Sequence, residues 1–224
     1  MKRFITLLIL IAVVISLCFN LVSCDKKIEY NEEEVLNAAR ELIEKSIVLN
    51  EIYWGSGIPF IPTSISLYCE ANILALSELG FYTIDELKKK TEEVFTSSYC
   101  QNIYSSSISS NEDGEYIPFY PRYYQKYEDE NQTIPISIMV YSKFENLLPD
   151  KVEYLYETLS FSHAEKDAVY VKIKALVTRD EERVQYSEKT IALKKEANGW
   201  RIDSPTYLKY NDKINEYEDL LGKK

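Results

Sequence analysis

The fold is decided by one stretch of the chain, VYVKIKALVT at residues 169–178. Valine, isoleucine and alanine alternate here with tyrosine, lysine and threonine. Such alternation is typical of a strand that has one buried and one wetter face. Antiparallel sheets commonly carry strands of this kind, with the apolar face against a core. We therefore expect a half-buried antiparallel sheet around residues 169–178.

Further strands are predicted on both sides of this one. Residues 185–195 form the next strand after a turn, and the pair Asn198-Gly199 is a strong hairpin signal before a last strand that includes Trp200. On the N-terminal side, residues 153–162 and one or two segments within 115–143 are expected to complete one antiparallel meander.

The N-terminal half of the chain carries helix signals instead. Asn31 is a good N-cap, glutamates follow it, and apolar residues then recur at helical spacing, which predicts a helix to about Asn50. Residues 64–79 read as a weaker helix that Gly80 ends. Thr83 and Glu86 form a capping box at the start of another helix.

A further short helix is expected at residues 98–107. Helices followed by a run of strands predict an α+β fold, in which the N-terminal helices pack on one face of a curved, cone-like antiparallel sheet. A helical signal peptide is expected to precede this domain.

The first 23 residues are a hydrophobic leader. Lys2 and Arg3 precede an almost wholly apolar run from Phe4 to Val22, and small residues close it. This is the organisation of a secretory signal peptide. An uncleaved transmembrane helix is the alternative, because residues 4–22 as a helix would span about 28 Å.

The tetrapeptide Leu21-Val22-Ser23-Cys24 favours a cleaved signal. It resembles the lipobox of bacterial lipoproteins. The resemblance implies that a lipoprotein signal peptidase cuts between Ser23 and Cys24, and that the Cys24 thiol carries a diacylglyceryl group. Two acyl chains give stable membrane anchoring where one gives only marginal binding. We therefore expect the membrane to be a partner through Cys24, with the protein on the extracytoplasmic face of the cell membrane.

This interpretation divides the chain into four parts. Residues 1–23 are the signal peptide, 24–30 the lipidated N-terminus and short tether, 31–210 a single α+β domain, and 211–224 a C-terminal tail that can form a short helix. Removing residues 1–23 takes away two basic residues, Lys2 and Arg3, and no acidic one. The formal charge then moves from −10 to −12.

Charge and composition exclude several classes of function. The chain has 26 basic and 36 acidic residues and no basic block, which argues against a nucleic-acid partner or binding to an anionic bilayer surface. The single His argues against a histidine-based metal site and against a Ser-His-Asp triad. We expect no metal and no cofactor.

Two cysteines, Cys69 and Cys100, remain in the predicted domain. Outside the cytoplasm they could form a disulfide, and closing a loop of about 30 residues would contribute roughly 3–4 kcal/mol. The alternative is two buried, reduced thiols, because Cys often packs as a small hydrophobic residue.

Three segments together resemble the nuclear-transport-factor-two-like (cystatin-like cone) fold of small bacterial lipoproteins. They are EVFTSSYC at residues 93–100, the strand at 167–178, and LKKEANGWRIDS at 193–204. The resemblance implies a cone whose sheet and helices enclose a pocket, which serves catalysis in some members and binding or dimerisation in others. The chain departs from the pattern by extra sequence before Thr83 and by the lack of an acid/base pair of the ring-isomerase kind. Fold therefore does not assign function.

Aromatic residues are the candidate ligand contacts. Tyr120, Tyr123 and Tyr124 lie in a tyrosine-rich segment, and Trp200 follows the predicted hairpin. Tyrosine offers a flat apolar face and a polar tip, so this group can line a site for a sugar, a peptide or an aromatic ligand. The alternative is ordinary packing of strands and loops.

Two classes of function follow from these observations. The first is a membrane-anchored binding or accessory module of the cell envelope, whose partner is an envelope protein or a small ligand. The second is an enzyme of the cone fold that uses a buried Asp or Glu with a Tyr on a small substrate, since that pair needs no His. The sequence assigns no catalytic residue, and the acidic charge and the tether favour the binding module.

Overall fold

The structure is a computed structural model of the chain that describes residues 30–63, 66–109, 120–128, 135–149, 151–179 and 183–210. The expected signal peptide, with Ser23 and Cys24, lies outside the described residues, as do most of the tether and the tail at 211–224. Across the described ranges, no helix combines the length and apolar character needed to cross a membrane.

The helices and strands confirm an α+β fold with two antiparallel sheets. In chain order they are α2 (Glu32–Tyr53), β1 (Tyr68–Glu70), α3 (Ile73–Leu79), α4 (Ile84–Glu92), α5 (Ser97–Ser107), β2 (Tyr123–Tyr127), β3 (Pro135–Tyr141), β4 (Lys151–Ala164), β5 (Val169–Arg179), β6 (Arg183–Glu196) and β7 (Gly199–Ile202).

The larger sheet has four antiparallel strands in the order β4-β5-β6-β7. β5 contains the stretch that the sequence singled out, and the alternation is confirmed: Val169, Val171, Ile173, Ala175 and Val177 are all fully buried. The hairpin before β7 is also confirmed, but its loop is Ala197-Asn198, because Gly199 already pairs with Glu196. Gly199 has a φ of 109°, which favours glycine at this position.

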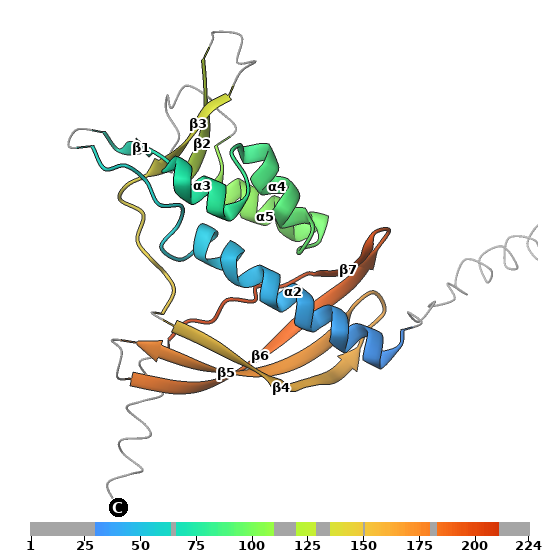
Figure 1. Cartoon of the computed structure of the whole chain (residues 1–224). Coiled ribbons are helices and arrows are strands. Elements are labelled where there is room, and N and C mark those ends of the chain that lie inside the picture. The colour runs from blue at the N-terminus through green and yellow to red at the C-terminus, as the bar shows by residue number, and fades with distance from the viewer. Residues whose placement is uncertain are drawn as a thin grey trace, which may run out of the picture.

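Helix α2 lies across one face of this sheet (Figure 1). The expected N-cap is confirmed, since Asn31 Oδ1 accepts hydrogen bonds from the backbone N–H groups of Glu33 and Glu34. A stripe of buried side chains, which includes Val35, Ala39, Leu42, Ile43, Leu49 and Ile52, faces the core.

The short helices α3, α4 and α5 lie on the other side of α2 from the larger sheet (Figure 1). The capping box of α4 is confirmed: Glu86 N donates to Thr83 Oγ1, and Thr83 N donates to Glu86 Oε2. A 2.8 Å hydrogen bond between Tyr53 and Thr91 joins α2 to α4. The helical layer is therefore tied to α2 by a buried polar contact as well as by apolar packing.

The second sheet has three strands in the order β1-β3-β2 and is separate from the first. This corrects the expectation that segments within 115–143 join one meander. β3 uses one edge to pair with β1, where Tyr68 lies opposite Tyr141, and the other edge to pair with β2, where Tyr124 lies opposite Met139. Because both edges of β3 are occupied, β4 cannot join it and starts a new sheet.

Helix α3 is shorter than the helix expected at residues 64–79. Residues 68–70 form β1, which pairs with a strand far along the chain. The helix begins after Asn72, whose side chain accepts hydrogen bonds from the N–H groups of Leu74 and Ala75. Gly80 ends it in the left-handed conformation with a φ of 72°, as the sequence predicts.

Candidate functional site

A groove of about 380 Å³ lies between α2, α3 and the C-terminal end of α4. This volume falls within the range of small-molecule sites, about 300–1,000 Å³. The lining consists of an apolar floor, formed by Val48, Leu49, Ile52, Leu79, Phe81 and Val94, and four charged residues, Lys45, Glu78, Lys90 and Glu93. The groove therefore combines an apolar surface with both signs of charge.

Helical spacing places one side of the groove. Val48, Leu49 and Ile52 lie three, four and seven positions after Lys45 in α2, so the four residues share one side of the helix. Leu49 and Ile52 are buried, whereas Val48 remains 50% exposed. The helix thus presents a partly exposed apolar ridge beside its buried stripe.

The end of α3 shapes a second side. The left-handed turn at Gly80 reverses the chain, and the N–H groups of Gly80 and Phe81 both donate to the Leu76 carbonyl. The reversal sends the Phe81 side chain into the floor of the groove, where it is almost fully buried. A Cβ at Gly80 would lie 3.3 Å from Lys90 Nζ, so the lysine lies directly over this turn.

The α4–α5 connection fixes the third side. Val94 accepts a hydrogen bond from Ile202 N, and Thr96 N donates to the Ile202 carbonyl, both at 2.9 Å. Thr96 and Ser98 also donate to Asp203, which forms a 2.7 Å ion pair with Lys194. These contacts hold Glu93 and Val94 against β7, so the groove has walls anchored to the larger sheet.

The charged groups of the groove are not paired with one another. Among the described residues, no ion pair or side-chain hydrogen bond involves Lys45, Glu78, Lys90 or Glu93. Two ammonium groups and two carboxylates are therefore free to contact a ligand. The floor can take an apolar body, while the charges can orient a polar or ionised end.

Two of the expected aromatic residues meet on the smaller sheet. Tyr120 stacks on Tyr141 with ring centroids 5.2 Å apart and an angle of 5° between the rings. Tyr141 contacts Tyr68, and Tyr68 contacts Tyr124 edge to face at 4.9 Å. The sequence predicted Tyr120 and Tyr124 but missed Tyr68 and Tyr141, because only strand pairing brings these segments together.

Tyr123 and Trp200 do not belong to that cluster. Tyr123 is fully buried on the opposite face of the same sheet; its hydroxyl donates to the Ile52 carbonyl and accepts from Ile58 N. Burial raises the pKa of Tyr123 to about 12. Trp200 is buried in β7 and donates to Glu34. Both side chains therefore serve packing, the alternative that the sequence left open.

The two cysteines are buried and do not form a disulfide in the structure. Cys69 is in β1 within 3.6 Å of Thr63 Oγ1, whereas the Cys100 thiol in α5 contacts the Phe95 carbonyl at 3.7 Å. Burial raises the pKa of Cys100 to about 11. This arrangement agrees with the alternative of two reduced thiols.

Carboxyl groups with shifted pKa values are stabilised as anions. The pKa of Glu34 is lowered by its hydrogen bonds from Trp200 and Lys195, and the pKa of Glu86 by the backbone N–H of Tyr82. Burial alone would raise the pKa of Asp203, but its contacts with Lys194, Thr96 and Ser98 outweigh that effect and lower it. A general acid needs a raised pKa instead.

The groove residues also lack the carboxylate–tyrosine pair of the enzymatic alternative, since no tyrosine lines the groove. The lone His163 stacks on Tyr170 with ring centroids 4.3 Å apart, on the larger sheet. Within the described ranges, no group of three or more His, Cys, Asp or Glu side chains could hold a metal ion.

The sequence did not predict the groove. Its residues come from α2, α3 and α4 and from the connections after α3 and α4, which supply Phe81, Glu93 and Val94, and the helical ones fit ordinary amphipathic helices. The signals that were present, the stop at Gly80 and the capping box at Thr83, fix helix ends without showing that the helices leave a space between them. No protein-family model, curated protein or solved structure matches this chain.

Proposed function

We propose that the chain is a membrane-anchored extracytoplasmic lipoprotein that acts as a binding module of the cell envelope. The observation that carries the binding role is the groove between α2, α3 and α4, with its apolar floor and four uncommitted charges. Its ligand is a small amphipathic molecule, which has an apolar body for the floor and an ionised group for the lysines or glutamates.

The anchoring part of the proposal rests on the sequence. Leu21-Val22-Ser23-Cys24 supports cleavage before Cys24 and its lipidation. We also propose that the domain is cone-like, as in nuclear-transport-factor-two-like lipoproteins. The support for this is that a long helix, α2, packs across a sheet that ends in a tight hairpin. A signal peptide at residues 1–23 completes this proposal.

A fluorescent probe tests the groove. The probe is 8-anilinonaphthalene-1-sulfonate, whose rings suit the floor and whose sulfonate suits Lys45 or Lys90. We expect saturable binding by the full chain with one probe per protein. Val48→Asp places a carboxylate in the groove and should weaken binding about tenfold or more.

Ile47→Asp is the matched control. Ile47 precedes Val48 in α2 and is 38% exposed, but it does not line the groove. Probe binding by this variant should match the unmodified chain. Equal loss of binding in both variants, or equal retention, would overturn the assignment of the ligand site to this groove.

Fractionation tests the anchor. Replacing Cys24 with Ala should move the protein out of the membrane fraction and abolish incorporation of labelled fatty acid. Cys69→Ala removes a thiol without touching the lipobox, so this variant should remain in the membrane fraction and keep its label. An unchanged location and mass of the Cys24→Ala protein would refute lipid anchoring.

A further inference from the structure

Four tyrosines contact one another in a chain on the smaller sheet; we call Tyr68, Tyr120, Tyr124 and Tyr141 the tyrosine face. Strand alternation puts Cys69, Tyr123, Gln125, Ile138 and Val140 on the buried side of the sheet. The residues between them, including three of the four tyrosines, lie on the other side. Tyr120 lies flat on Tyr141 and is 59% exposed.

The tyrosine face has polar groups to offer as well as rings. The Tyr68 hydroxyl donates to the Pro121 carbonyl at 2.7 Å, which fixes that ring in place. By contrast, the hydroxyls of Tyr120, Tyr124 and Tyr141 have no hydrogen-bond partner among the described residues. Burial raises the pKa of Tyr68 to about 12 and also raises that of Tyr124, so both hydroxyls remain protonated at neutral pH.

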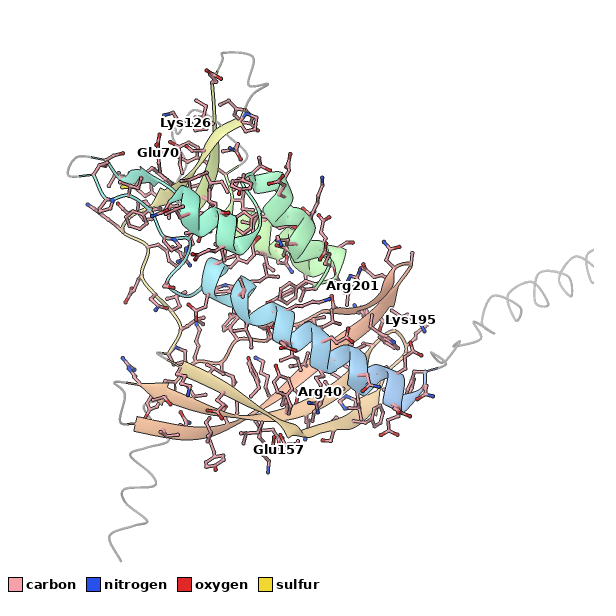
Figure 2. All side chains as sticks on the ribbon, viewed as in Figure 1. Arg40, Glu70, Lys126, Glu157, Lys195 and Arg201 are labelled. Atoms are coloured by element: carbon pink, nitrogen blue, oxygen red, sulfur yellow. The ribbon has the colours of Figure 1, made fainter. Side chains whose placement is uncertain are left out.

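An ion pair lies on the same side of the sheet as the tyrosine face. Glu70 and Lys126 lie on the same side of the sheet and form a 3.3 Å ion pair, and Figure 2 shows the two side chains at this end of the molecule. The formal charges of Glu70 and Lys126 cancel, so this pair adds no net charge beside the tyrosine face of a protein whose net charge is −10. Such a surface suits an uncharged ligand better than a nucleic acid or another polyanion.

The tether determines where this face points, if the chain is anchored as proposed above. Residues 24–30 span at most about 25 Å. The first turn of α2 lies beside the β6–β7 hairpin, where Glu34 contacts Trp200 and Lys195. The smaller sheet lies beyond the other end of α2, where Tyr123 bonds to the Ile52 carbonyl, and the 22 residues of α2 span about 33 Å. Figure 1 shows the smaller sheet and the start of α2 at opposite ends of the domain.

We infer that the tyrosine face binds an uncharged polysaccharide chain that lies outside the membrane. The flat C–H surface of a pyranose ring packs on an aromatic ring, and its hydroxyls can bond to the hydroxyls of Tyr120, Tyr124 and Tyr141, which have no hydrogen-bond partner within the described part of the chain. Tyr120 stacks on Tyr141 and covers one face of that ring, so no groove for a proline-rich peptide opens between the two rings, and the exposed ring of Tyr120 offers the flat surface for a sugar. The outward position places the face where envelope glycans are found.

Calorimetric titration with the β-1,4-linked hexasaccharide of N-acetylglucosamine, in detergent with the full chain, tests this inference. Tyr120→Ala should raise the Kd about tenfold, and Tyr120→Trp should restore or tighten binding, because a larger ring is kept. Tyr186→Ala is the matched control, since Tyr186 is an exposed tyrosine of β6, 72% exposed, and far along the chain from the tyrosine face. It should bind like the unmodified protein.

Two results would overturn the inference. One is a hexasaccharide that does not bind, or that binds Tyr120→Ala and Tyr186→Ala equally well. The other is that a proline hexapeptide binds in place of the sugar, and that Tyr120→Ala weakens this peptide binding. Fractionation of the unmodified chain separates this inference from the proposed function. A chain that binds the hexasaccharide but is absent from the membrane fraction would keep the tyrosine face and reject only the membrane orientation. A chain that is anchored in the membrane and binds the probe in the groove, but does not bind the hexasaccharide, would reject only the tyrosine face.

Discussion

Trp200 in β7 donates a 2.8 Å hydrogen bond from Nε1 to Glu34 Oε1 in the first turn of α2. The same carboxylate oxygen lies 3.2 Å from Lys195 Nζ, and that ammonium group is 5.4 Å from the centre of the Trp200 ring. Two residues more than 160 positions apart thereby join the start of the first helix to the last strand. The contact lies at the end of the domain where the proposed tether would attach.

Trp200→Phe should lower the free energy of unfolding by about 1–3 kcal/mol, because it removes the indole donor and leaves a space in a buried site. Urea unfolding followed by circular dichroism measures this change. Glu34→Gln keeps an amide oxygen that can accept from the indole, so this variant should lose less unfolding free energy than Trp200→Phe. A larger loss for Glu34→Gln than for Trp200→Phe would show that the charge, and not the buried ring, holds the two elements together.

Acid should weaken the domain through its anionic carboxylates. The pKa values of Asp203, Glu34 and Glu86 are all lowered in the folded state. Their stabilising effect is complete above the ordinary values, 3.8 for Asp and 4.5 for Glu, and is lost as the pH falls through the lowered values. The urea concentration at the midpoint of unfolding should therefore be lower at about pH 3 than at pH 7.

Asp203→Asn should reduce the difference in urea midpoint between pH 7 and about pH 3, because an amide cannot titrate. It should also weaken the chain at pH 7 through loss of the Lys194 ion pair. An undiminished pH dependence in Asp203→Asn would mean that Asp203 contributes little to acid sensitivity.

Gln125 joins α4 to the smaller sheet. Its Oε1 accepts a 2.9 Å hydrogen bond from Ile84 N, and its Nε2 donates to the Ser137 carbonyl at 2.9 Å. Gln125→Ala leaves these backbone groups without partners in a buried place and should cost about 2–4 kcal/mol in urea unfolding. Lys126→Ala, which breaks only an exposed ion pair, should change the unfolding free energy by less than about 1 kcal/mol.

Arg122 is a charged residue inside the core. Nη2 donates to the Gly55 carbonyl at 2.6 Å and the guanidinium lies 3.9 Å from the centre of the Phe144 ring, but Nε and Nη1 have no hydrogen-bond partner among the residues that the structure describes. Burial lowers the pKa of Arg122. Arg122→Met keeps the apolar packing and removes the buried charge, so it should change stability by less than about 1 kcal/mol.

Arg122→Ala should instead cost about 2–4 kcal/mol, because it leaves a cavity next to Phe144. Thermal unfolding of both variants measures the contrast. Equal losses would show that the single bond to Gly55, and not packing, accounts for the contribution of Arg122.

The helix ends show how far local chemistry specifies this structure. Asn31, Thr83 and Gly80 each satisfy backbone groups within a few residues of themselves, so their roles could be predicted from neighbouring sequence and are confirmed. The strand at 169–178 was predictable for a similar reason, since one buried face is enough to impose alternation. The lipobox is also a local signal, and its outcome stays a prediction.

The sequence by itself determined the α+β class and the strands of the larger sheet, which were expected at residues 153–162, 169–178, 185–195 and through Ile202. Only the tertiary structure decided that β3 pairs with β1 and not with β4, and so created a second sheet that gathers Tyr68, Tyr120, Tyr124 and Tyr141. It also decided that three helices leave a groove between them. The physical reason is that hydrogen-bond partners of a strand edge, and the space between packed helices, depend on segments far apart in the chain, whereas caps and alternation depend on neighbours.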